Sequence, residues 1–162
     1  MGGPRPSVRQ RAEALGLTYL FRGLAEDVLD TIARAADVVL VEKGRRIFGV
    51  GDHADGIHVV VTGSIKESVV AADGGELVFE VFTRGAVEGE PGTFSFERTR
   101  MVDLIAVEDS TLLRISRDVL LEIGWSNQLV ILRLMAGLSQ QIRQAVDDQT
   151  ALAFRRVRER VA

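Results

Sequence analysis

Short apolar runs separated by turn residues fill the middle of the chain and restrict its fold more than any other feature. From Asp37 onward they read DVVLVE, RRIF, IHVVVT, SIKESVV, ELVFEVF, VDLIAV and TLLRI, with KG, TG, ADGG and EDS among the turns. In ELVFEVF, Leu77, Phe79 and Val81 occupy alternate positions, which is the period of a strand with one wetter face. About seven short strands at this spacing predict a β-roll, jelly roll or sandwich.

Helical periodicity flanks this region on both sides. Residues 12–36 carry apolar side chains at spacings of three and four, around the turn LFRGL. After Trp125 a heptad-like stripe follows, made of Ile131, Met135, Leu138, Ile142, Ala145, Gln149 and Leu152. The sequence therefore predicts a mainly β fold with flanking α-helices, ending in one long helix from about residue 127 to 153.

The length of this last helix points to a partner. At 1.5 Å per residue it would be roughly 40 Å long, which is more than one small β-roll can cover. We therefore predict that residues 126–153 pair with a second copy of the chain in a homodimer. The alternative is that the whole stripe packs on its own β-roll. Trp125 follows a glycine at the start of this helix and is expected to be a packing anchor.

Composition narrows the classes of function. The 162 residues fit one domain with an appended element, and the net charge of −3 disfavours nucleic acid as a partner of the whole chain. There is no cysteine, and His53 and His58 do not form a metal-ligand pattern. No serine has a histidine base nearby. We expect no metal and no enzyme on this scaffold. No apolar run reaches 18 residues, so we expect no membrane span and a cytoplasmic location.

Residues 88–101, EGEPGTFSFERTRM, contain the candidate binding residues. Gly89 and Gly92 permit backbone conformations and close approaches that other residues forbid. Pro91 suits the first turn of a short helix, where its missing N–H is not needed. Such a turn can bring backbone groups close to a ligand.

Charged residues in the same stretch suggest the chemistry of that ligand. Arg100 or Arg98 can form a bidentate, charge-assisted pair with a phosphate. Glu90 would repel a phosphate, but it can accept a hydrogen bond from a sugar hydroxyl. Together these residues favour a nucleotide monophosphate. The alternative is a surface loop in which Glu90 forms an ion pair with an arginine.

The order of these features resembles the cyclic-nucleotide-binding sensor domain of Crp/Fnr-family transcriptional regulators. The resemblance runs from Leu20 to Ala162. FRGLAEDVLDTIA resembles the opening helix of that domain, GRRIFGVGDHADGIHVVVTGSI resembles its glycine-punctuated strands, and GAVEGEPGTFSFERTR resembles its phosphate-binding cassette. It implies a bacterial β-roll protein that senses cAMP, another cyclic nucleotide or a related anion, with no permanent cofactor. The ligand would control the geometry of the dimer helix.

The resemblance also assigns roles to single residues. It implies that Glu90 holds the ribose 2′-hydroxyl and that Arg100, ten positions later, holds the cyclic phosphate. Arg98 would require an insertion in the alignment and is expected to be solvated. The ligand-binding set that follows is Gly89, Glu90, Gly92, Thr93, Arg100 and Met101.

Departures from the family pattern concern the ligand. The family usually has leucine at the position of Pro91, and a small residue, often bearing a hydroxyl, at that of Met101. Contacts with the base are expected at Arg143, Gln144, Ala145, Val146 and Asp147. Ala145 and Val146, two turns before the sequence LAF, cannot hydrogen-bond a base through their side chains. Three alternatives therefore stay open: a ligand-independent dimerisation module with a degenerate cassette, a stand-alone nucleotide-binding protein, and a sensor of a cyclic dinucleotide or another acidic metabolite.

Four segments are expected. Residues 1–11 would form a flexible basic arm, 12–125 the β-roll with its N-terminal helix, 126–153 the dimerisation helix, and 154–162 a hinge. The last segment, FRRVRERVA, resembles the junction with a winged helix-turn-helix, although four arginines also suit a solvated helix end. We expect contact with DNA only through a C-terminal domain absent from this chain.

Overall fold

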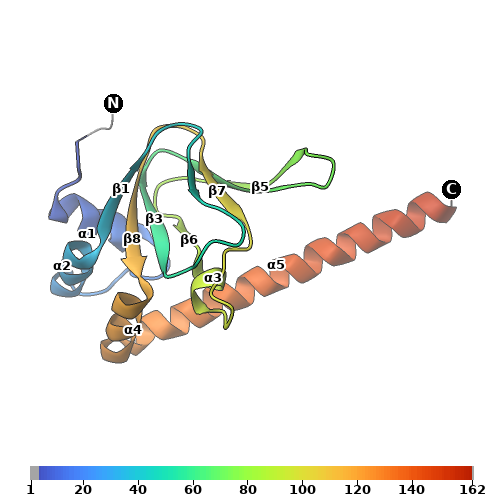
Figure 1. Cartoon of the computed structure of the whole chain (residues 1–162). Coiled ribbons are helices and arrows are strands. Elements are labelled where there is room, and N and C mark those ends of the chain that lie inside the picture. Colours follow the sequence, from blue (N-terminus) through green and yellow to red (C-terminus); the bar gives the residue numbers. More distant parts are fainter. Residues whose placement is uncertain (1–3, 162) are drawn as a thin grey trace.

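A computed structural model describes residues 4–161, so the first three residues of the predicted arm and Ala162 lie outside the described residues. Figure 1 shows a roll of strands with helices on one side and a long helix that leaves the roll. The elements in order are α1 (Val8–Leu17), α2 (Glu26–Ala35), β1 (Asp37–Val41), β2 (Arg46–Phe48), β3 (Gly56–Thr62), β4 (Ile65–Val70), β5 (Glu76–Phe82), β6 (Val87–Glu88), α3 (Glu90–Phe94), β7 (Asp103–Ala106), β8 (Ser110–Ser116), α4 (Arg117–Ser126) and α5 (Gln128–Val161).

The strands form two antiparallel sheets of four. One has the order β1-β8-β3-β6 and the other the order β2-β7-β4-β5. This confirms the predicted mainly β fold with flanking helices and a long final helix. Because α1, α2, α4 and the start of α5 cover the first sheet, its central strands β3 and β8 have buried side chains on both faces.

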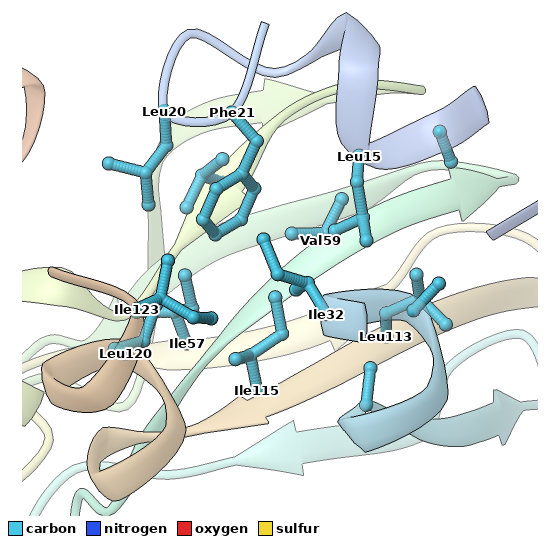
Figure 2. Packing of buried hydrophobic residues seen from close by; sticks show 14 of the residues in the cluster. Leu15, Leu20, Phe21, Ile32, Ile57, Val59, Leu113, Ile115, Leu120 and Ile123 are labelled. Carbon is cyan, nitrogen blue, oxygen red and sulfur yellow. The ribbon is translucent and has the colours of Figure 1, made fainter. Parts of the chain in front are cut away.

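β3 illustrates how the two faces are used. Six of its seven residues are buried, which explains its nearly continuous apolar sequence. Ile57 and Val59 belong to the larger core under the helices, whereas Val60 packs in the smaller core between the sheets. Figure 2 shows Ile57 and Val59 packed with Leu15, Phe21 and Ile32 of the helical layer.

The hairpin of β4 and β5 projects from the roll (Figure 1). The predicted alternation in β5 does not produce a buried face, because the first six of its seven residues are exposed. Leu77 and Phe79 are 54% and 56% exposed, and Val78 on the other face is 42% exposed. In the single chain only Phe82, at the end of this strand, packs against the core, and residues 76–81 are exposed on both faces.

The N-terminal helical region differs from the predicted single segment 12–36. α1 begins earlier, at Val8, because Ser7 and Gln10 form a capping box. Residues 8–11 of the expected arm are therefore helical. Residues 18–25 then form a turn that separates α1 from α2, and this turn contains Tyr19, Leu20 and Phe21.

The segment before the long helix also differs from the prediction. Ser116 caps α4 by accepting a hydrogen bond from the backbone N–H of Val119, and α4 ends at Ser126. Trp125 at the end of α4 is 87% exposed, so the expectation that it anchors the packing of this chain is wrong. The ring lies at the end of a short surface helix, where the core does not reach it.

α5 has 34 residues, which correspond to about 51 Å. Its first turns dock on the roll through buried Val130 and Leu134, while Ile142, Leu152 and other apolar side chains farther along are exposed. The helix continues to Val161, so residues 154–161 of the segment predicted as a hinge are helical in this structure. This region contains neither glycine nor proline to interrupt the helix. Among residues 4–161, no helix is both long and apolar enough to cross a membrane.

Candidate functional site

The glycines of the candidate site allow α3 to approach its neighbours closely. Gly89 follows β6 and precedes α3 with a φ of 97°, in the left-handed region. A Cβ atom on Gly89 would lie 2.5 Å from Nη1 of Arg100, and one on Gly92 would lie 2.7 Å from the carbonyl oxygen of Thr99. Pro91 stands in the first turn of α3, as the sequence predicted.

Arg100 lies inside the roll and is 4% exposed. Its Nη1 donates to the carbonyl oxygen of Gly89 at 2.9 Å, and its Nη2 donates to that of Gly56 at 2.7 Å. The guanidinium carbon is 4.1 Å from the centroid of the Phe48 ring, which is a cation–π distance. Burial lowers the pKa of Arg100. The Nε atom is buried and has no hydrogen-bond partner.

Thr93 helps to hold the guanidinium of Arg100 in place. Its buried hydroxyl lies 2.7 Å from each of the carbonyl oxygens of Gly56 and Gly89, the two carbonyls that Arg100 also contacts. It also lies 3.4 Å from Nη1 of Arg100 and accepts from it. Thr93 therefore joins α3 to β3 and helps to fix the guanidinium.

Glu90, the first residue of α3, is 1% exposed. Its Oε1 accepts a hydrogen bond of 2.8 Å from the hydroxyl of Tyr19, while its buried Oε2 has no partner. Burial raises the pKa of Glu90 to about 7, although the hydrogen bond from Tyr19 and the charge of Arg100 oppose this rise. The carboxyl group can therefore change its charge near neutral pH.

Two further glutamates make the surroundings acidic. Glu88 on β6 is 7% exposed, and its pKa is raised by burial and then by a hydrogen bond with Glu67 of β4. His58 lies opposite Glu88 in the ladder between β3 and β6, and burial together with Arg100 lowers the pKa of His58 to about 3. Sequence analysis considered His58 only as a metal ligand and assigned neither glutamate to the binding site. The signal was present, because Glu67 shares the inward face of β4 with buried Ile65.

A cavity of about 140 Å³ lies beside these groups. It is lined by Phe48, Glu67, Gly89, Pro91, Gly92, Arg100, Met101, Val102 and Gln141. It is smaller than the roughly 300–1,000 Å³ of most small-molecule sites. Met101, which is 63% exposed, stands at its edge. Of the residues predicted from the cassette, Gly89, Gly92, Arg100 and Met101 line the cavity. Glu90 lies between the lining residues Gly89 and Pro91, and Thr93 contacts Arg100.

Other predicted residues lie elsewhere. Residues 143–147 are exposed on α5 and do not line the cavity, so contact of these residues with a base stays a prediction. The helix contributes Gln141 instead, which sequence analysis did not single out. Arg98 is partly buried rather than solvated and has a φ of 51°. Within the described residues, no group of three or more His, Cys, Asp or Glu side chains is arranged to hold a metal ion.

Comparison with known proteins identifies the family of the chain. Residues 38–124, more than half of the chain, match the family model of the cyclic nucleotide-binding domain. The chain belongs to the cyclic nucleotide-binding domain family. It is similar to the cyclic AMP receptor protein of Thermus thermophilus, with 29% identity over 143 residues that cover 88% of this chain and 66% of that protein.

Solved structures extend the similarity beyond the matched segment. The catabolite activator protein of Thermus thermophilus has a TM-score of 0.77 and 28% identity, over 85% of this chain and 64% of that chain. The sensor domain of the transcriptional regulator DNR from Pseudomonas aeruginosa has a TM-score of 0.76 and 26% identity, over 86% of this chain and 93% of that domain. The resemblance to Crp/Fnr-type sensor domains is confirmed. The chain spans about two thirds of the length of the Thermus relatives.

Proposed function

We propose that this chain is the sensor part of a Crp/Fnr-like transcriptional regulator and that it binds a cyclic nucleotide or a related anion between α3 and the roll. One observation carries the proposal. Arg100 is buried and lines the cavity, and Glu90 is buried between Gly89 and Pro91, two lining residues. Each has an atom without a partner, Nε in Arg100 and Oε2 in Glu90. One atom is a donor suited to a phosphate oxygen, and the other is an acceptor suited to a sugar hydroxyl.

The charges around the cavity make Arg100 the central residue of this proposal. Among the described residues that line the cavity, Arg100 is the only cation, and Glu67 is an acid. An anionic ligand would therefore depend on a single guanidinium for its charge compensation. Glu90 would have to be ionised to accept two hydrogen bonds, one from Tyr19 and one from the ligand.

We further propose that α5 forms the interface of a homodimer. Met135, Ile142 and Leu152 of the predicted stripe are 60%, 66% and 51% exposed in the single chain. Pairing two such helices would bury this stripe. Ligand binding would act by favouring one arrangement of the two helices, to the extent that it binds that arrangement more tightly.

Other parts of the proposal follow from the relatives. The regulator would contact DNA through a domain outside this chain, would act in the bacterial cytoplasm without a catalytic step, and would need no permanent cofactor. The similarity to a cyclic AMP receptor protein and to the sensor domain of DNR supports regulation, and cAMP is the first ligand to test.

A ligand-independent dimerisation module is a second candidate, and specific observations favour it. The cavity is small, Met101 replaces a residue that could bring a hydroxyl, and the acidic side chain of Glu67 lines the cavity, where it would oppose an anion. In that case the fold would transmit a signal other than a nucleotide.

A thermal-shift panel separates the two candidates. The ligands are cAMP, cGMP, a cyclic dinucleotide and, as the control, linear AMP. A ligand at 100 times its Kd adds about 2.7 kcal/mol to the free energy of unfolding, which corresponds to a rise in Tm of roughly 5–11 °C for a chain of this size. We expect such a rise with a cyclic nucleotide and a much smaller one with AMP. A flat panel would favour the ligand-independent module.

A further inference from the structure

The turn between α1 and α2 touches the candidate ligand site. Tyr19 of this turn donates its hydroxyl hydrogen to Oε1 of Glu90 over 2.8 Å. Burial, the charge of Glu90 and this hydrogen bond all raise the pKa of Tyr19, so the phenol stays protonated and remains a donor at neutral pH. Glu90 thus has one oxygen occupied by Tyr19 and one oxygen, Oε2, without a partner.

The same tyrosine also touches α5. A Cβ atom on Gly137 would lie 2.5 Å from the hydroxyl oxygen of Tyr19 and 2.8 Å from its Cζ. The ring therefore lies directly against the backbone of α5, at a position where only glycine fits. Glycine is less favourable than alanine in the interior of a helix, and the contact with Tyr19 explains why residue 137 is nevertheless a glycine.

Neighbouring contacts fix the turn to the helix. Arg133, one helical turn before Gly137, donates to the carbonyl oxygens of Leu20 and Arg22. Leu20 is buried in the same core cluster as Leu134 of α5. The turn is thus attached to the first half of α5 at Leu20 and Arg22, directly after Tyr19, so a displacement of Tyr19 would act on contacts that hold the helix.

We propose that Tyr19 is a positioning residue that orients Glu90 for the ligand and couples the occupancy of the site to α5. Its hydroxyl fixes Oε1 and leaves Oε2 for a hydroxyl group of the ligand. Its ring conveys any shift of Glu90 to α5 at Gly137. This inference rests on the proposed function, because it assigns the ligand contact to Glu90.

A ligand-free titration tests the Tyr19–Glu90 contact. The pKa of Glu90, measured by NMR of the side-chain carboxyl carbon and assigned with Glu90→Gln, should be higher in Tyr19→Phe than in the wild type. The reason is that the lost hydrogen bond stabilises the ionised form. The other charged groups near Glu90 are Glu67 of β4, Glu88 of β6 and Arg100, and the substitution leaves them in place. An unchanged pKa would overturn the proposal.

Further variants test the link between Tyr19 and α5. Gly137→Ala should also raise the pKa of Glu90, although residue 137 belongs to another element, because its Cβ would displace the tyrosine. Ser139→Ala, at an exposed position of α5, is the matched control and should leave that pKa unchanged. Hydrogen exchange of α5 amides 130–141 should be faster in Tyr19→Ala than in Tyr19→Phe, which keeps the ring. Equal exchange in these two variants would refute the coupling.

The experiments distinguish an error in the proposed ligand from an error in the proposed role of Tyr19. If the wild type binds no nucleotide, the proposed ligand is wrong, while the titration still decides whether Tyr19 controls Glu90. If the wild type binds and Tyr19→Phe binds with the same affinity and the same pH dependence, Tyr19 is not a positioning residue. We expect Tyr19→Phe to weaken binding about 10-fold at pH 7, with part of the affinity recovered at higher pH, where Glu90 is ionised.

Discussion

Arg100 lines the cavity and Glu90 is buried between the lining residues Gly89 and Pro91, yet these two side chains, both among the described residues, form no ion pair with each other. Arg100 donates to two backbone carbonyls, and Glu90 accepts from Tyr19. Each keeps an unpaired atom, which costs roughly 1–3 kcal/mol in a folded protein. Such unpaired charged groups are typical of a site arranged for a ligand rather than for stability.

Gly89 offers a test of how closely Arg100 is packed. Gly89→Ala should lower the free energy of unfolding by about 2–4 kcal/mol, because a left-handed φ of 97° is combined with a Cβ only 2.5 Å from Nη1 of Arg100. The control is Gly74→Ala, with a φ of 86° and no atom within 4 Å of the added Cβ. It should cost only about 1 kcal/mol. Urea unfolding measures the free energy of unfolding of both variants. Equal losses in the two variants would contradict the close packing of Arg100 against Gly89.

Glu88 should make stability depend on pH. Because the pKa of Glu88 is raised by burial, the folded protein keeps a proton that the unfolded chain releases above about pH 4.5. The free energy of unfolding should therefore fall as the pH rises above that value. Glu88→Gln removes this loss, so at pH 8 it should be more stable than the wild type, by on the order of 1–3 kcal/mol.

The control for this prediction is Glu108→Gln, because Glu108 is exposed. Its stability should follow that of the wild type between pH 5 and pH 8. Urea unfolding at several pH values gives the slopes, and parallel curves for Glu88→Gln and the wild type would show that Glu88 is not protonated in the folded protein.

Met101 should limit the affinity of the site. Met101→Ser places a hydroxyl at the edge of the cavity, next to Arg100, where it can donate to an anion. A hydrogen bond to a charged group is worth about 1.5–3 kcal/mol, so the affinity for a cyclic nucleotide should rise about 10-fold or more. Fluorescence titration with a labelled nucleotide measures this gain, and weaker binding by the variant would place the anion elsewhere.

Ile142 tests the proposed homodimer. Ile142→Glu introduces a charge into the apolar stripe of α5, and burying it in an interface would be costly. We expect a dimeric wild type and a monomeric variant by analytical ultracentrifugation. Gln140→Glu adds the same charge on the other side of the helix and should stay dimeric. A monomeric wild type at high concentration would refute the interface.

Local rules explain what the sequence could predict at the site. Gly89 and Pro91 have strong conformational preferences, so the turn and the short helix were readable from the residues themselves. The spacing between Glu90 and Arg100 identified the family pattern; Arg100 lines the cavity and Glu90 is buried next to the lining residue Gly89. The short runs of strand-like sequence likewise predicted the β-roll, and the heptad-like stripe predicted α5.

Long-range contacts explain what could not be predicted. Tyr19 is 71 positions from Glu90, and nothing local in the turn LFRGL or its neighbours indicates that contact. Glu88 and Glu67 meet only because two sheets close into a roll. The cavity residue of α5 proved to be Gln141 because the register of the helix against the roll depends on packing, for example of Leu134, which a count along the sequence cannot supply.

The most direct test of the account is calorimetric titration of a cyclic nucleotide into the wild type, Arg100→Ala and Arg98→Ala. We predict one ligand per chain in the wild type, similar affinity in Arg98→Ala, and a loss of about 2–4 kcal/mol in Arg100→Ala, or roughly 30- to 1,000-fold in Kd. Circular dichroism and Arg100→Lys, which keeps the charge, control for folding. Wild-type affinity in a folded Arg100→Ala protein would contradict the assignment of the phosphate to this cavity.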